Sequence, residues 1–211
     1  MMKANNKTVL FSVIFFGSIW GILEATLGYA LHFLPVLISG SIMFPIAATI
    51  MVMTFHQTKS RSAMIYVALI AASLKSVNFF MPGLLPIKTY NPMISIMLQS
   101  LVVYAVLPMV EKKSFAVQML GLGIVSLSWR ALFIMNIAIN NALTGFMFNQ
   151  LASSSTIISF IVISGLIEMA ILIGLAAIQQ LTKNKIQFSI KPHWALSLSM
   201  FIFAVVLTIL L

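Results

Sequence analysis

Residues 8–31 read TVLFSVIFFGSIWGILEATLGYAL, an apolar run that contains a single charged residue, Glu24. The run is long enough for a helix that crosses the ~30 Å hydrocarbon core of a bilayer. Similar runs follow along the chain, and we predict helices at 8–31, 36–55, 63–80, 93–110, 115–137, 156–181 and 194–211. Because the runs are continuous and do not alternate, they favour an all-α membrane bundle over a β-barrel. We expect one transmembrane domain over 1–211, with about seven spans.

The composition supports a membrane protein. Of the 211 residues, 61% are hydrophobic and 7% are charged, whereas soluble proteins carry about 25% charged residues. Such a chain cannot cover a water-facing surface, which excludes a soluble domain, a disordered tail and a nucleic-acid-binding module.

The basic residues predict the orientation. Nine of them lie in alternate loops and at the N-terminus: Lys3, Lys7, Lys59, Arg61, Lys112, Lys113, Lys183, Lys185 and Lys191. The opposite loops contain only Lys88. By the positive-inside rule, the N-terminus is cytoplasmic and the C-terminus is outside. The net charge of +9 then faces anionic lipid or an acidic partner and requires no nucleic acid.

The sequence offers no signature of catalysis. It has no cysteine, its three histidines are far apart at His32, His56 and His193, and it has no Gly-x-Ser-x-Gly motif. We therefore expect neither an enzyme nor a bound metal or cofactor.

Charged residues inside the predicted spans are the first candidates for a functional site. Glu24, Lys75, Arg130 and Glu168 each cost roughly 2.5–3.5 kcal/mol at the bilayer centre. Two acids and two bases sum to zero, so we expect them to face the bundle interior and to neutralise one another or a ligand. A second interpretation, that they are structural ion pairs which fix helix register, stays open.

Two amides complete the predicted substrate site. Asn78 and Gln99 lie at the level of these charges, in the middle and outer half of the predicted bundle. The external segments 81–92 and 140–150 are rich in Pro, Gly and amides and would close over a small solute. Their predicted lid contacts are Lys88, Tyr90, Asn91, Asn140 and Asn141.

A stripe of small residues marks a close helix contact. Gly17, Gly21 and Ala25 follow one another at intervals of four, on one face of the first predicted helix. Such a stripe lets a second helix approach closely. The second helix belongs either to this chain or to a partner subunit.

Two segments resemble a known family. Residues 17–32, GSIWGILEATLGYALH, and residues 71–83, AASLKSVNFFMPG, together with Asn91-Pro92 are similar to the substrate-binding S components of energy-coupling-factor vitamin transporters of bacterial inner membranes. The resemblance implies a core of six helices, to which 194–211 adds a seventh. It also implies an outward-facing pocket for a vitamin-like solute, and contact of the small-residue stripe with a transmembrane coupling subunit.

These observations lead to an importer subunit as the predicted function. No Gly-x-x-x-x-Gly-Lys-Ser/Thr loop for ATP occurs in the sequence, so a coupling subunit and ATPases would supply the energy. The chain would capture a small polar metabolite from outside. Two alternatives remain: an autonomous ion- or proton-coupled secondary transporter, and a membrane scaffold without transport.

Overall fold

The computed structural model describes residues 5–31, 36–82, 85–112, 114–182, 190 and 192–210. Within these ranges the chain is helical, without strands. The elements are α1 (Asn6–Leu31), α2 (Val36–Thr58), α3 (Ser62–Ser76), η1 (Val77–Phe80), α4 (Pro86–Val110), α5 (Phe115–Thr144), η2 (Asn149–Leu151), α6 (Ser154–Ile158), η3 (Ser159–Ile163), α7 (Ser164–Thr182) and α8 (Trp194–Leu210).

Within the described residues, six helical segments are long and apolar enough to cross a membrane, which supports a multi-pass helical membrane protein. The last of these segments, Ser154–Ile178, joins α6, the single π-helical turn η3 and α7. The seventh predicted helix, α8, is also apolar but has only 17 residues.

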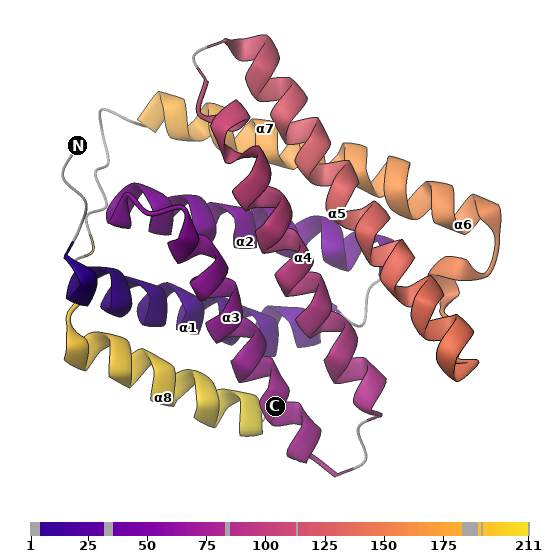
Figure 1. The fold of residues 1–211 in the computed structure, drawn as a ribbon, viewed down its shortest axis with the longest axis horizontal. Coiled ribbons are helices and arrows are strands. Elements are labelled where there is room, and N and C mark those ends of the chain that lie inside the picture. Colours follow the sequence, from indigo (N-terminus) through magenta and orange to yellow (C-terminus); the bar gives the residue numbers. More distant parts are fainter. Residues whose placement is uncertain are drawn as a thin grey trace.

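The helices form two crossing layers (Figure 1). Helices α3, α4 and α5 run beside one another, and they cross α1, α2 and α7 obliquely. Helix α8 packs along α1, where the Ser197 hydroxyl donates to the Phe11 carbonyl at 2.9 Å. The C-terminal helix is therefore an integral part of the bundle.

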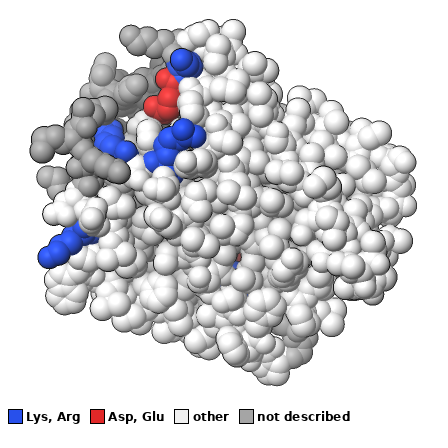
Figure 2. All heavy atoms as spheres, viewed as in Figure 1, with Lys and Arg blue, Asp and Glu red and all other residues white. Residues whose placement is uncertain are grey.

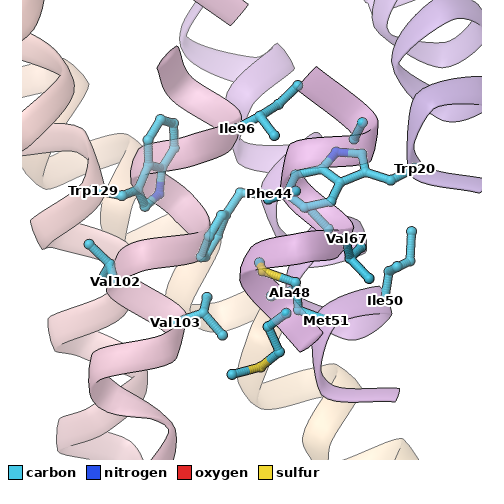
Figure 3. Packing of buried hydrophobic residues seen from close by; sticks show 14 of the residues in the cluster. Trp20, Phe44, Ala48, Ile50, Met51, Val67, Ile96, Val102, Val103 and Trp129 are labelled. Carbon is cyan, nitrogen blue, oxygen red and sulfur yellow. The ribbon is translucent and has the colours of Figure 1, made fainter. Parts of the chain in front are cut away.

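A continuous apolar core lies between the two layers. Trp20, Phe44 and Met51 are fully buried in it, and the ring of Phe44 stacks on Trp129 with 5.5 Å between centroids. Figure 3 shows these side chains among valines of α3 and α4. The core thus joins α1, α2, α3, α4 and α5 into one unit.

The two glycines of the small-residue stripe pack inside the molecule. A Cβ added at Gly17 would lie 2.5 Å from Ile70 Cβ, and one added at Gly21 would lie 2.3 Å from Leu74 Cδ1. Ala25 is buried as well. Of the two readings of the stripe, the structure shows internal packing, and these three residues present no free face to a partner subunit.

Both expected lid segments are more helical than the sequence suggested. Helix α4 begins at Pro86 instead of residue 93, because proline is favoured in the first helical turn, where its missing N–H costs nothing. Lys88, Tyr90 and Asn91 are thus helical rather than parts of a loop. Gly83 and Leu84 of the same segment lie outside the described residues.

The second lid segment changes in the same way. Helix α5 continues past residue 137 to Thr144 and ends at Gly145, whose φ of 70° is the left-handed conformation that glycine adopts readily. Asn140 and Asn141 therefore lie in the last turns of α5. The Asn141 side chain donates to the Phe146 carbonyl at 2.9 Å, so it holds the chain that leaves the helix.

The described basic loop residues gather at one end of the molecule, which we call the basic end. Lys59 and Arg61 lie between α2 and α3, and Lys112 follows α4. Figure 2 shows Lys and Arg side chains collected towards the side where the N-terminus lies in Figure 1. Lys3, Lys113, Lys183, Lys185 and Lys191, which also entered the orientation argument, lie outside the described residues.

We predict that Gly17→Ala destabilises the protein by about 1–3 kcal/mol, because the new methyl group would overlap Ile70 Cβ on α3. Gly174→Ala is the matched control, since a Cβ there meets nothing within 4 Å. Reversible unfolding in mixed micelles would measure both free energies. Equal stability of the two variants would contradict the close contact of α1 with α3.

Candidate functional site

A buried ion pair joins α5 to α7. Arg130 Nη2 and Nε lie 2.8 and 3.2 Å from the same Glu168 carboxylate oxygen, Oε2. Both side chains have an exposed fraction of 0%. Because a charge without a partner is very costly in such surroundings, the pair holds the two helices at one register.

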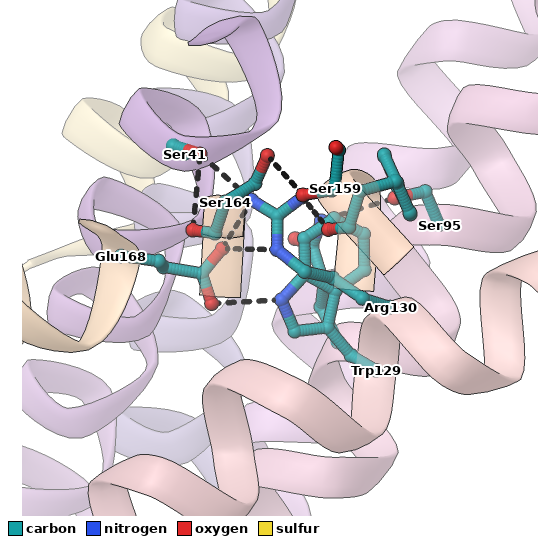
Figure 4. A network of polar contacts seen from close by, with 9 residues as sticks. Ser41, Ser95, Trp129, Arg130, Ser159, Ser164 and Glu168 are labelled. Atoms are coloured by element: carbon teal, nitrogen blue, oxygen red, sulfur yellow. Dashed lines mark hydrogen bonds and ion pairs between the residues drawn. The ribbon is translucent and has the colours of Figure 1, made fainter. Parts of the chain in front are cut away.

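The remaining polar atoms of this pair are also engaged (Figure 4). Trp129 Nε1 donates to the second Glu168 oxygen at 2.9 Å, and Arg130 Nη2 donates to the Ser41 hydroxyl at 2.9 Å. Arg130 Nη1 donates to the Phe160 carbonyl at 3.2 Å. Every guanidinium nitrogen and both carboxylate oxygens are thus hydrogen-bonded within the protein.

The π-helical turn η3 explains how a backbone carbonyl can take part. In η3 the Ser164 N–H bonds to the Ser159 carbonyl, five residues back, and the Ser164 hydroxyl donates to the same carbonyl at 3.3 Å. A π-turn interrupts the regular ladder and is frequent at functional sites. Here it leaves the Phe160 carbonyl available to Arg130.

These contacts favour the structural interpretation of Arg130 and Glu168 over the ligand-binding one. Their hydrogen-bonding groups are used by each other and by α2, α5 and η3, and the guanidinium carbon lies 4.7 Å from the Trp129 ring. The interpretation as a structural ion pair that fixes helix register therefore fits both residues. We therefore do not retain either residue in the candidate solute site.

The second pair of charges is arranged differently. Glu24 on α1 accepts a hydrogen bond from Trp20 Nε1 at 3.2 Å, and it interacts electrostatically with Lys75 on α3. Among the described residues, no ion pair of 4.0 Å or less joins Glu24 to Lys75. Both side chains are half-buried. Unlike Arg130 and Glu168, they retain capacity for another partner.

Helix register places several amides at the level of Lys75. Arg61 bonds the Tyr104 carbonyl, which aligns α3 with the antiparallel α4. Counting the same number of residues from that contact forward along α3 and backward along α4 places Lys75 at about the level of Tyr90 and Asn91.

The same construction extends to α5. Gly121 faces Met109 and Val110, which aligns α4 with α5. Asn140 follows Gly121 on α5 by as many residues as Asn91 precedes Val110 on α4, so the two asparagines lie at about the same level. These residues lie at the end of α3, α4 and α5 that is opposite the basic end.

Asparagines at this end have unused hydrogen-bonding atoms. Six buried side-chain polar atoms in the described residues make no hydrogen bond. Four of the six are asparagine atoms at this end: Asn78 Oδ1, Asn91 Oδ1, Asn136 Nδ2 and Asn140 Nδ2. We call these four residues, with Glu24 and Lys75, the polar tier.

The polar tier is separate from the ion pair of α5 and α7. On α5, Asn136 and Asn140 of the tier lie six and ten residues after Arg130, which corresponds to about 9 and 15 Å along the helix axis. We therefore treat the four buried charges as two groups: Arg130 and Glu168, whose polar atoms are hydrogen-bonded within the protein, and Glu24 and Lys75, which retain capacity for another partner.

The other predicted residues lie around the tier. Gln99 is buried on α4, and its Nε2 donates to Ser95 Oγ at 3.0 Å. Gln99 lies on the same face of α4 as Asn91 and Ser95, nearer the middle of the helix. Lys88 and Tyr90 are exposed on the first turns of α4.

Sequence reasoning did not identify Ser41, a partner of Arg130, or Asn136 of the tier. Asn136 lies four residues before Asn140, a spacing that puts both on one helix face. That spacing is visible in the sequence. Ser41 gives no comparable signal, because its role depends on the packing of α2 against α7.

No family model matches the chain, and neither a curated protein nor a solved structure matches it. Functional inference therefore rests on the geometry of these two sites.

We predict that Arg130→Met and Glu168→Leu each destabilise the protein by about 3–5 kcal/mol, because each leaves the other residue buried without its partner. The double variant Arg130→Met/Glu168→Leu should lose much less than the sum of the two single losses. Equilibrium unfolding of all three variants, with exposed Lys88→Met as the control, measures the coupling. Additive losses would contradict a structural pair.

Proposed function

We propose that this chain is the solute-binding subunit of a membrane importer, and that the polar tier captures a small polar metabolite. The observation that carries the proposal is the set of buried asparagine atoms without hydrogen bonds. A buried polar group without a partner costs about 1–3 kcal/mol. A solute that bonded several of these atoms would recover that cost on binding, whereas a scaffold gains nothing from them.

The proposal assigns the energy source to other subunits. The sequence contains no phosphate-binding loop of the Gly-x-x-x-x-Gly-Lys-Ser/Thr type. The resemblance to S components of energy-coupling-factor transporters suggests a coupling subunit and ATPases as partners. Because Gly17 and Gly21 are covered by α3, such a coupling subunit would dock on another face of the bundle.

The proposal also assigns an orientation and a seventh crossing in the bacterial cytoplasmic membrane. Helix α8 starts beside Phe11 near the start of α1 and packs against η1, at the tier end of α3. Its 17 residues span about 25 Å, slightly less than the hydrocarbon core. With the basic end in the cytoplasm, the polar tier faces outward, where a solute arrives.

Cysteine labelling tests the orientation, and the cysteine-free sequence gives no background. We expect Lys88→Cys to react with a membrane-impermeant maleimide in intact cells, because Lys88 is exposed near the tier. Lys59→Cys, at the basic end, should react only after permeabilisation. The reverse pattern would place the tier in the cytoplasm and contradict capture from outside.

Solute capture itself is tested by analysis of what copurifies with the protein. We expect mass spectrometry of the gently purified full chain to detect a small polar metabolite near one equivalent. Asn91→Leu/Asn140→Leu should reduce its occupancy about tenfold or more, since two hydrogen bonds are lost. Exposed Asn6→Leu, at the start of α1 and far from Glu24 along that helix, is the matched control.

Two outcomes would overturn the proposal. Absence of any metabolite, together with no binding of a metabolite extract, would favour a scaffold. Accumulation of the solute in liposomes by the chain alone under a proton gradient would establish the autonomous secondary transporter.

A further inference from the structure

The charges that remain for a ligand are one acid and one base. Arg130 and Glu168 form a salt bridge with each other, so Glu24 and Lys75 are the titratable side chains of the polar tier. Glu24 Oε1 accepts from Trp20, and no hydrogen bond to Oε2 is found among the described residues. The Lys75 ammonium donates no hydrogen bond there either, although burial removes much of its water.

The separation of these two groups restricts the charge of a ligand. The close contact of Gly21 with Leu74 places Glu24 and Lys75 on neighbouring turns of α1 and α3, and the two charges interact electrostatically. Their charged atoms are nevertheless more than 4.0 Å apart, so they do not form a direct ion pair. An anion would satisfy Lys75 and be repelled by Glu24, and a cation would do the reverse. A molecule that carries both charges satisfies both groups and leaves the net charge at this depth at zero.

Two asparagines, Asn78 on η1 and Asn91 on α4, lie on elements next to the one that carries Lys75. Asn78 follows Lys75 by three residues, one turn further along. Asn91 is level with Lys75 across the α3–α4 contact. The side-chain carbonyl oxygens of these two amides make no hydrogen bond within the described residues and can accept one from a ligand. An uncharged hydrocarbon would leave both of them unpaired.

We propose that the polar tier binds a small zwitterion of amino-acid type, with its carboxylate on Lys75 and its ammonium on Glu24. The amides of Asn78 and Asn91 bond the polar groups of the rest of the molecule. This inference rests on the proposed function and specifies its substrate class. It assigns different roles to the two buried charge pairs, because Arg130 and Glu168 build the fold while Glu24 and Lys75 contact the solute.

The test uses the purified full chain in nanodiscs. The probes are free α-amino acids, each with its N-acetyl derivative, which lacks the ammonium group, and its methyl ester, which lacks the carboxylate. Thermal unfolding and titration calorimetry measure binding, since a ligand of the folded state raises Tm. We expect at least one free amino acid to raise Tm, and neither of its derivatives to do so at the same concentration.

Variants then assign the two charges. Glu24→Gln and Lys75→Met should each weaken binding of that amino acid about tenfold or more. Lys75→Arg, which keeps the charge, should bind more tightly than Lys75→Met. Exposed Lys59→Met, at the basic end, should bind as the unaltered chain does. The Tm of each variant without ligand reports whether it is folded.

The results separate failure of this inference from failure of the proposed function. Equal binding of a free amino acid and its derivatives, binding of none of the probes, or affinities unchanged in folded Glu24→Gln and Lys75→Met would overturn the zwitterion assignment. If a neutral or singly charged metabolite copurifies, the assignment falls but solute capture stands. If nothing copurifies or binds, both fall.

Discussion

The salt bridge between Arg130 and Glu168 is the constraint on which the bundle depends. Its two charges lie where water does not reach, so each needs the other at hydrogen-bonding distance. Helices in a bilayer gain little from apolar burial against one another, because lipid tails are equally apolar. This pair, in which two guanidinium nitrogens bond one carboxylate oxygen, is supported by Trp129, Ser41 and the Phe160 carbonyl and therefore specifies how α2, α5 and α7 meet.

That constraint also distinguishes structural from functional polar groups in this chain. Arg130 and Glu168 would be the natural choice for a ligand by charge and depth alone. Their hydrogen bonds within the protein remove them from that role, and the unpaired amides of Asn91 and Asn140 take their place. In this chain, the buried charges Arg130 and Glu168 are satisfied by contacts between helices, whereas the amide atoms without hydrogen bonds mark the candidate site.

The apolar runs predicted the helical architecture because length and hydropathy are local properties of the sequence. They also located Glu24, Lys75, Arg130 and Glu168 inside spans. They did not reveal which acid meets which base, because that depends on the register between helices far apart in the chain. The ends of α4 and α5 were misjudged for a local reason: Pro86 starts a helix rather than preventing one, and the asparagines before Gly145 remain helical.

The glycines of α1 link the fold to the polar tier. With no side chain at Gly17 and Gly21, α3 approaches α1 until Ile70 and Leu74 fill the space above them. Glu24 and Lys75 follow that contact immediately on the two helices, so the same close approach brings their charges within electrostatic range. Trp20 then holds one oxygen of Glu24 from a position one turn earlier. A side chain larger than glycine at the contact would push the helices apart and widen the gap between acid and base. The small residues that resemble a docking motif for a partner therefore position the charges that we assign to the solute.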